Sequence, residues 1–237
     1  MSKIDAIVLD LDGTLLRSDK TLSPRNYEAV KSCFNSGVHI IVATARPPRV
    51  ARQFIEQMPF VDYILFYNGA LVTCESKQIQ RHFGIPMDVN EKISKFIAME
   101  APQSFISYEV NDCWYTSTVI PDSECIHYGI RPHDPKPELV DNDFINSLSP
   151  TKILVLGCNS WEDIIEQFGD AVNVIATDGG ALVQIMDKSA SKEDVVQWVL
   201  NDMGVISENV MVFGDYYNDL GLFHAITIPY DLCAPVL

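Results

Sequence analysis

Two acidic side chains stand at the end of a short apolar run near the start of the chain. The run Ala6–Leu9 leads into Asp10 and Asp12, with Gly13 directly after them. An apolar run that stops at charge beside a glycine is typical of a buried strand and the turn that follows it. Carboxylates at such a place are costly unless they hold a metal or do chemistry. Taken alone, however, the pair is better explained as an ordinary Asx turn.

The same arrangement of an apolar segment and a polar ending recurs further along the chain. The polar groups are Thr44 after residues 38–43, Asp215, Asn218 and Asp219 after residues 210–213, and Lys192 in the first turn of a helix that begins after Ser191. In an open α/β sheet, ligands bind beyond the carboxyl ends of the strands, so these groups are candidates for one site. A lysine in the first turn opposes the helix dipole but suits an anion, although a solvated surface lysine explains the local pattern equally well.

Together these groups would suit phosphoryl transfer. The carboxylates of Asp10 and Asp215 can hold a hard cation such as Mg²⁺, which prefers oxygen ligands. One carboxylate can attack phosphorus, and the second aspartate of the first pair can protonate the leaving oxygen and later activate water. A hydroxyl, a lysine and an amide can hold the phosphoryl oxygens as charge shifts. Each signal is weak alone, whereas all of them in this order are much more specific.

The segments that carry these groups alternate between strand and helix patterns over residues 1–82. Strands are expected at residues 6–9, 38–43 and 63–67, and helices from Pro24, capped by Ser23, and around Val50, Phe54 and Met58. Asn68-Gly69 between two apolar runs is a strong hairpin signal. This order predicts an α/β fold with a doubly wound, Rossmann-like parallel sheet.

Residues 83–183 have a different pattern and are expected to form an inserted α+β domain. Short strand patterns at residues 104–110, 113–118, 152–156 and 172–176 accompany helix patterns at residues 90–99 and after residue 160, and the proline-rich residues 121–137 predict a long loop. Residues 184–237 return to the first pattern. We therefore predict one core from residues 1–82 and 184–237, with residues 83–183 inserted into it.

Composition and charge restrict the partners. The 237 residues are 47% apolar and carry a formal net charge of -15. This is the composition of a globular protein, and the acidic charge argues against nucleic acid and against an anionic membrane surface. A small phosphorylated metabolite stays compatible, because a local field can oppose the net charge. The six cysteines lack metal-binding spacing, and no signal peptide or membrane span is expected, which predicts a cytoplasmic monomer or weak homodimer.

Five short motifs occur in a fixed order. They are Asp10-Leu11-Asp12-Gly13-Thr14-Leu15-Leu16, Thr44-Ala45-Arg46-Pro47, Asn68-Gly69-Ala70, Ser191-Lys192 and Gly214-Asp215-Tyr216-Tyr217-Asn218-Asp219. Together they resemble the motifs of the haloacid dehalogenase-like (HAD) phosphatases, and more narrowly the Cof-type branch with a C2B cap. The resemblance extends from the N-terminus to about residue 224. It implies that residues 83–183 are the cap and set substrate specificity.

The resemblance also implies the chemistry of the site. Asp10 would be the nucleophile that forms a phospho-aspartate, and Asp12 the general acid and base. Mg²⁺ would be held by the Asp10 carboxylate, the Asp12 main-chain carbonyl and Asp215, with Asp219 orienting the metal shell. An aspartate at position 12 implies a phosphatase or phosphomutase rather than a dehalogenase.

The remaining implied roles concern the substrate. The phosphoryl oxygens would contact the side chains of Thr44, Lys192 and Asn218 and the main-chain amides near Leu11 and Ala45. The leaving group would be faced by Arg46, Asn68, Gly69 and the cap. Sugar phosphates and similar small metabolites are the usual substrates of the family.

Three features depart from the family pattern. Ala45 and Glu193 stand where glycine is common, and Glu193 brings a negative charge near the expected phosphate site. The chain also ends at Leu237, whereas relatives usually continue with a further strand and helix. We therefore expect a complete catalytic set but reduced stability, since a missing edge element exposes apolar surface.

Three alternatives stay open. A response-regulator receiver also phosphorylates an aspartate in a doubly wound sheet, although it needs neither the Asp-x-Asp-Gly-Thr spacing nor an insert of about this size. A phosphomutase or phosphotransferase of the same fold would use the same phospho-aspartate. A phosphate-binding protein that has lost turnover would retain the fold alone.

Overall fold

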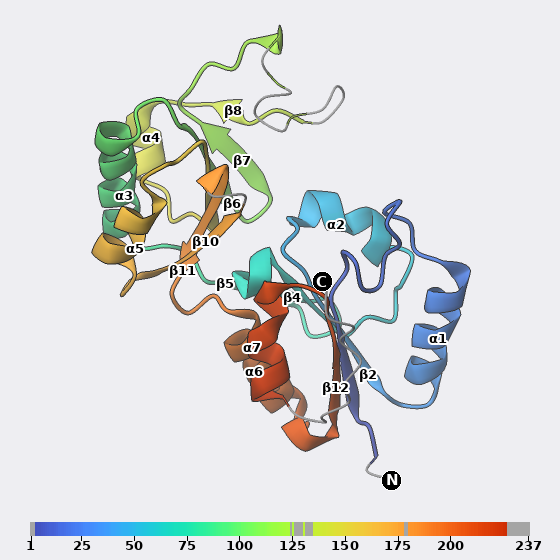
Figure 1. Cartoon of the computed structure of the whole chain (residues 1–237). Helices are drawn as coiled ribbons and strands as arrows, with labels where there is room; N and C mark the ends of the chain where they lie inside the picture. Colours follow the sequence, from blue (N-terminus) through green and yellow to red (C-terminus); the bar gives the residue numbers. More distant parts are fainter. Residues whose placement is uncertain (1–2, 124, 126–129, 131–134, 178–179, 227–237) are drawn as a thin grey trace. The chain divides into compact units, whose positions relative to one another are not determined.

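The chain folds into two compact units. The computed structural model describes residues 3–123, 125, 130, 135–177 and 180–226 (Figure 1). One unit contains the residues up to Arg81 and those from Ala190 onward, and the other is His82–Ser189. Each unit has its own six-stranded sheet.

The first sheet has the strand order β12-β1-β2-β3-β4-β5. Its strands are β1 (Ala6–Leu9), β2 (His39–Ala43), β3 (Tyr63–Phe66), β4 (Leu71–Cys74), β5 (Ile79–His82) and β12 (Val210–Phe213). The pairs of β1 with β12, β1 with β2, and β2 with β3 are parallel, whereas β4 runs antiparallel to β3. The predicted parallel core sheet is therefore confirmed, with a hairpin added at one edge.

Helices cover both faces of the parallel strands. They are α1 (Pro24–Asn35), α2 (Pro48–Ile55), α6 (Lys192–Met203) and α7 (Leu220–Ala225). Figure 1 shows α1 on one side of β2 and β12, and α6 and α7 on the other side. Strand β1 and all of β2 except His39 are buried, as expected for apolar strands between two helical layers. This arrangement confirms the doubly wound α/β core.

The predicted cap of helix α1 is present. The Ser23 side-chain oxygen accepts a hydrogen bond of 3.0 Å from the main-chain N–H of Asn26, and Pro24 occupies the first helical position. The cap satisfies an N–H group that has no partner within the helix.

Replacing Ser23 by alanine should therefore lower the free energy of unfolding by about 1 kcal/mol. Ser32→Ala is the matched control, because Ser32 is exposed in the same helix and caps nothing. Urea denaturation of both variants measures the difference. Equal stability of the two variants would contradict a capping role for Ser23.

The predicted turn at Asn68-Gly69 joins β3 to the antiparallel strand β4 through a short 3₁₀ turn, Tyr67–Gly69. Gly69 has a φ of +103°, and a Cβ atom there would lie 2.9 Å from the main-chain oxygen of Ser191. Only glycine allows this conformation and this approach. The turn therefore packs against the first residues of α6, which carry Lys192.

The second sheet has the strand order β10-β11-β9-β6-β7-β8. Its strands are β6 (Phe105–Val110), β7 (Cys113–Thr116), β8 (Glu138–Leu139), β9 (Lys152–Leu156), β10 (Val172–Thr177) and β11 (Leu182–Asp187), and its helices are α3 (Met87–Glu100), α4 (Asn142–Asn146) and α5 (Trp161–Phe168). The pairs are antiparallel except that of β7 with β8. An apolar core built around Ile93, Ile153 and Ile185 joins helices and sheet. The inserted α+β unit is thus present.

One predicted boundary is wrong. The return to the core was expected at residue 184, but this position lies inside β11, which pairs with β10 and β9 of the second sheet. The chain rejoins the first unit at Ala190. A short apolar run has the same pattern in either sheet, so the sequence did not distinguish the two.

Two further expectations concern segments that lie partly outside the described residues. Parts of the predicted loop at residues 121–137, and residues 227–237 of the C-terminal segment, lie outside the described residues. Within the described part, no helix combines the length and apolar character needed to cross a bilayer.

Candidate active site

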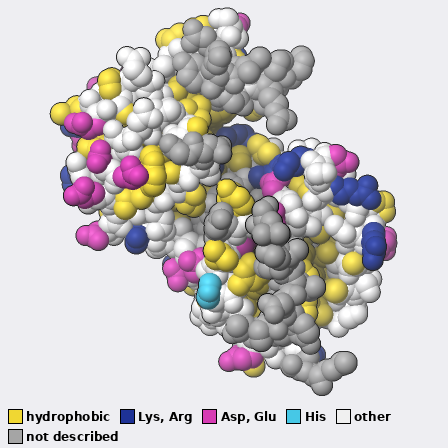
Figure 2. All heavy atoms as spheres, in the orientation of Figure 1, with side chains coloured by type: hydrophobic (Ala, Val, Ile, Leu, Met, Phe, Trp, Pro, Cys, Tyr) yellow, Lys and Arg dark blue, Asp and Glu magenta, His cyan; other side chains and the backbone are white. Residues whose placement is uncertain are grey.

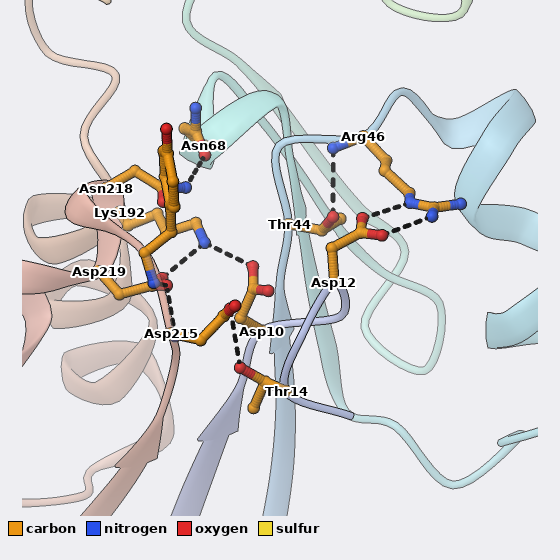
Figure 3. Close-up of polar contacts among 11 residues, drawn as sticks. Asp10, Asp12, Thr14, Thr44, Arg46, Asn68, Lys192, Asp215, Asn218 and Asp219 are labelled. Atoms are coloured by element: carbon orange, nitrogen blue, oxygen red, sulfur yellow. Dashed lines mark hydrogen bonds and ion pairs between the residues drawn. The ribbon is translucent and has the colours of Figure 1, made fainter. Parts of the chain in front are cut away.

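The predicted polar groups of the first unit gather where its parallel strands end (Figure 3). Leu9 at the end of β1 pairs with Val42 of β2 and with Phe213 of β12. The main-chain N–H of Asp10 continues this ladder with a 3.0 Å hydrogen bond to the Phe213 oxygen. Because the strands end at the same level, the residues after them share one edge of the sheet.

Lys192 is the centre of this group. Its side chain is fully buried, and its Nζ donates 2.7 Å hydrogen bonds to Oδ1 of Asp10 and to Oδ1 of Asp219. Ser191 caps helix α6 by accepting a bond from the Asp194 N–H, which fixes the helix end that carries the lysine. The sequence left open whether Lys192 is a solvated surface residue, and its burial excludes this.

Asp219 holds the loop after β12 as well as the lysine. Its second oxygen, Oδ2, accepts 3.2 Å hydrogen bonds from the main-chain N–H groups of Asp215 and Tyr216. A Cβ atom on Gly214 would come within 2.5 Å of the Asp219 carboxyl carbon, so the glycine allows this close approach. Both oxygens of Asp219 are therefore engaged inside the protein, and its role here is to fix Lys192 and the loop.

Three carboxylates lie close enough to share a cation. Oxygens of Asp10, Asp215 and Asp219 all lie within 4.8 Å of one another. Burial raises the pKa of Asp10 to about 6, against the opposing effect of Lys192, and the charges of Asp219 and Asp215 raise it further. Oxygen ligands with excess negative charge are the donor set that Mg²⁺ prefers. The residues present therefore fit a divalent cation.

Gly13 and Thr14 shape the other side of Asp215. Gly13 has a φ of +81°, and a Cβ atom there would lie 1.9 Å from Oδ2 of Asp215. The Thr14 hydroxyl donates a 3.2 Å hydrogen bond to Oδ1 of the same carboxylate. Any other residue at position 13 would collide with Asp215, which explains the glycine after the Asp-x-Asp pair.

Asp12 points away from Asp10 and toward Arg46 (Figure 3). Two cations, Arg46 and Lys20, hold its carboxylate. Arg46 donates from Nε and Nη2 to the two Asp12 oxygens, at 2.6 Å each, and Lys20 donates from Nζ to Oδ1 at 2.7 Å. The Arg46 guanidinium also lies over the Phe54 ring, 5.0 Å from its centre. Hydrogen bonding to Arg46, aided by Lys20, lowers the pKa of Asp12 to about 2. In this arrangement Asp12 is an ionised carboxylate.

Thr44, Asn68 and Asn218 form a third set of contacts. The Thr44 hydroxyl oxygen accepts a 3.1 Å bond from the Arg46 N–H, and the Thr44 main-chain oxygen accepts one of 2.9 Å from the Asn68 N–H. Asn218 donates from its side-chain nitrogen to Oδ1 of Asn68 at 2.9 Å. Thr44 and Asn68 are buried. The end of β2, the turn after β3 and the loop after β12 are thus tied together.

The structure shows the protein neighbours of several residues that have predicted substrate roles. Gly69 is buried and packs against Ser191, and Leu11 is buried with its oxygen accepting a bond from the Leu16 N–H. Glu193, the departure from the family glycine, has its carboxyl group against Gly221 of α7, where any side chain would collide with it. Ala45 is half-buried. The substrate roles of Leu11, Ala45 and Gly69 stay predictions.

The sequence did not indicate two of the side-chain contacts, that of Lys20 with Asp12 and that of Thr14 with Asp215. Thr14 belongs to the first motif, which also contains two carboxylates, but it was given no role there. Lys20 lies in the polar segment after the motif, where a charged residue is typical of any exposed turn. Its partner, Asp12, is set by the turn conformation and leaves no signal in the sequence.

Comparisons with known proteins agree with this geometry. A sequence model of the haloacid dehalogenase-like hydrolases matches residues 7–231. The 5-amino-6-(5-phospho-D-ribitylamino)uracil phosphatase YitU of Bacillus subtilis is 25% identical over 236 residues, which cover 90% of this chain and 81% of that protein.

Two solved structures share the fold. The TM0651 protein of Thermotoga maritima superposes with a TM-score of 0.77 at 21% identity, over 94% of this chain and 84% of that one. The HAD phosphatase BT1666 of Bacteroides thetaiotaomicron has a TM-score of 0.79 at 19% identity, over 94% and 82%. The match to the family model excludes a response-regulator receiver. The chain belongs to the haloacid dehalogenase-like hydrolases, which confirms the Cof-type phosphatase family predicted from its motifs.

Proposed function

We propose that this enzyme is a Mg²⁺-dependent phosphatase that hydrolyses a small phosphorylated metabolite through a phospho-aspartate on Asp10. The observation that carries the proposal is the buried Lys192, held between Asp10 and Asp219 beside a cluster of three carboxylates. A buried cation next to excess negative charge provides for an anion and a divalent metal in one place. A protein that only kept the fold would have no need of this charged interior.

The Asp10 carboxylate, the Asp12 main-chain oxygen and Asp215 would hold Mg²⁺, with Asp219 fixing their surroundings. Bound Mg²⁺ supplies positive charge that neutralises the phosphoryl oxygens. Lys192 adds a second positive charge beside Asp10, and the Thr44 hydroxyl and the Asn218 amide supply hydrogen bonds to the same oxygens. Main-chain amides at Leu11 and Ala45 complete the phosphoryl site.

Two displacements at phosphorus follow. In the first, an Asp10 oxygen attacks phosphorus, the bond from phosphorus to the ester oxygen breaks, and Asp12 gives that oxygen a proton. In the second, Asp12 takes a proton from a water that attacks the phospho-aspartate. Inorganic phosphate leaves and the Asp10 carboxylate is restored. Asp12 can give a proton only after its ion pair with Arg46 has been broken, because that pair keeps it ionised.

A sugar phosphate or a related polyol phosphate is the substrate class that we propose. The relative named above is a phosphatase for a compound with a phosphorylated ribityl chain. The second unit, residues 82–189, would act as the cap that selects the leaving group, as the family resemblance implies. Arg46 and Asn68 would face that group from the core.

Hydrolysis of 4-nitrophenyl phosphate, with Mg²⁺ and with excess EDTA, tests the metal requirement. We expect activity with Mg²⁺ and none with EDTA, and Asp215→Asn should raise the Mg²⁺ concentration for half-maximal activity at least about 10-fold. Asp88→Asn is the matched control, because Asp88 is exposed on α3 and forms a surface ion pair with Lys92 across one helical turn. Undiminished activity in EDTA would contradict the metal proposal.

The same assay, with an analysis of its products, distinguishes a phosphatase from a phosphomutase. Inorganic phosphate should form in step with 4-nitrophenol, also when a sugar phosphate is present as acceptor. Transfer of the phosphoryl group to that acceptor in place of phosphate release would favour a mutase instead. No turnover of any phosphate ester by folded protein with Mg²⁺ would favour a binding protein.

A further inference from the structure

The surroundings of Asp12 contain more positive charge than orienting one carboxylate requires. Arg46 alone holds both Asp12 oxygens, each at 2.6 Å, and its guanidinium group lies over the Phe54 ring. Lys20 adds a second cation to the same carboxylate at 2.7 Å. The three side chains together carry a net charge of about +1. This is opposite in sign to the chain as a whole, whose net charge is -15.

Lys20 reaches Asp12 from a tightly specified turn. Its φ is +62°, which is uncommon for a residue other than glycine. Two main-chain hydrogen bonds close the turn, from Lys20 to the Arg17 oxygen and from Arg17 to the Thr21 oxygen, both at 2.9 Å. Asp19 fixes it further by accepting bonds from the N–H and the hydroxyl of Thr21. Sparsely populated backbone conformations that are held this firmly cluster at functional sites.

Both cations are available to a ligand. The side chains of Lys20 and Asp12 are 56% and 36% exposed, and Arg46 retains 16%. An exposed lysine–aspartate pair contributes little to stability, so an incoming anion can replace Asp12 as a partner of Lys20 at small cost. The Arg46 fork uses two of its five N–H groups on Asp12, and planar anions accept from such a fork in pairs.

The charge pattern is visible on the surface. In Figure 2, dark blue lysine and arginine side chains gather over α2, while acidic side chains are scattered over much of the remaining face. Besides Arg46 just before it, α2 itself carries Arg49 and Arg52. A local positive field in an acidic protein attracts an anionic ligand toward that place.

We propose that Lys20 and Arg46 form a subsite for a second anionic group, a carboxylate or a second phosphate, on the leaving portion of the substrate. This inference rests on the proposed function, in which Asp12 serves the leaving oxygen, so cations around Asp12 lie on the side of the leaving group. Binding of the second anion to Arg46 would take the guanidinium from Asp12 and release that side chain for catalysis. The enzyme would then act best on phosphorylated sugar acids or sugar bisphosphates.

Two matched pairs of substrates test the subsite. 3-Phosphoglycerate and glycerol 3-phosphate differ by a carboxylate in place of a CH₂OH group, and so do 6-phosphogluconate and glucitol 6-phosphate. In at least one pair, the wild-type enzyme should prefer the carboxylate by about tenfold or more in kcat/KM, through a lower KM and, because the bound anion frees Asp12, a higher kcat. The preference should shrink as the salt concentration rises. Equal kcat/KM within both pairs would overturn the inference.

The variant Lys20→Gln shows whether Lys20 recognises the carboxylate of the substrate or only positions Asp12. The variant should reduce the preference for the carboxylate by about fivefold, chiefly by raising the KM of the carboxylate member of each pair. Lys31→Gln, which removes one positive charge from α1 of the same unit, should leave the preference intact. If Lys20→Gln lowers kcat equally for both members of a pair, Lys20 only positions Asp12 and the subsite is refuted.

The same assays distinguish the two proposals. If the wild type hydrolyses 4-nitrophenyl phosphate but shows no preference within the pairs, the phosphatase stands and the subsite falls. If it hydrolyses no phosphate ester in the presence of Mg²⁺, both fall together.

Discussion

Replacing Lys192 by methionine should destabilise this protein more than any other single change in the site. The variant leaves the buried carboxylates of Asp10 and Asp219 without their shared cation. Removing one partner of a buried ion pair costs about 3–5 kcal/mol of unfolding free energy. Activity should fall by at least about 100-fold as well, because the phosphoryl oxygens lose a positive charge.

Urea denaturation in the presence of EDTA measures the stability effect without the metal. Lys95→Met is the matched control, because Lys95 is exposed on α3 and forms a surface ion pair with Glu91. Combining Lys192→Met with Asp219→Asn removes one of the orphaned charges, so the double variant should be more stable than the sum of the single effects predicts. If Lys192→Met is as stable as Lys95→Met, the buried network described here is contradicted.

Asp10→Asn should have the largest effect on activity, a loss of at least about 10⁴-fold in kcat, because an amide oxygen cannot serve as the nucleophile. The same variant should not harm the fold. Asparagine is close in shape to a protonated aspartate, and burial already favours the neutral form of Asp10. Loss of activity without loss of stability would identify a chemical role rather than a structural one.

The stability of this variant should depend on pH in a defined direction. The folded-state pKa of Asp10, about 6, lies above the ordinary value of 3.8 for an aspartate. Relative to asparagine, the ionised aspartate therefore weakens the folded state as pH rises through about 6, and this penalty is absent below about pH 4. In EDTA, the thermal midpoint of Asp10→Asn should exceed that of wild type at pH 8 and equal it near pH 4. An advantage that grows toward low pH would contradict the raised pKa.

The elements that carry the site were predictable because their signals are local. The strand Ala6–Leu9 has the bounds that its apolar run predicts, and the side chains of Ser23 and Ser191 cap the helices that they were expected to cap. The repeated pattern of an apolar run followed by polar groups indicated one shared site. The parallel register, in which Leu9 pairs with Val42 and Phe213, brings those groups together.

The contacts between these elements were not predictable in the same way. The pair of Asn68 and Asn218 joins side chains 150 positions apart, and neither residue type indicates which partner it will find. The ion pair of Asp12 with Arg46 depends on how the chain turns after β1 and after β2. The boundary at β11 was misplaced because a short apolar run has the same pattern in either of the two sheets.

Trapping the phosphorylated residue would show directly whether Asp10 is the nucleophile. Asp12→Asn should slow hydrolysis of the intermediate, so that phospho-aspartate accumulates when the variant is mixed with 4-nitrophenyl phosphate and Mg²⁺. Borohydride reduces an aspartyl phosphate to homoserine, which peptide mass spectrometry locates in the sequence. We expect homoserine at position 10 and none in the Asp10→Asn/Asp12→Asn double variant. Turnover by the wild type, with the trapped group at another residue or with no trapped group in the single variant, would contradict this role of Asp10.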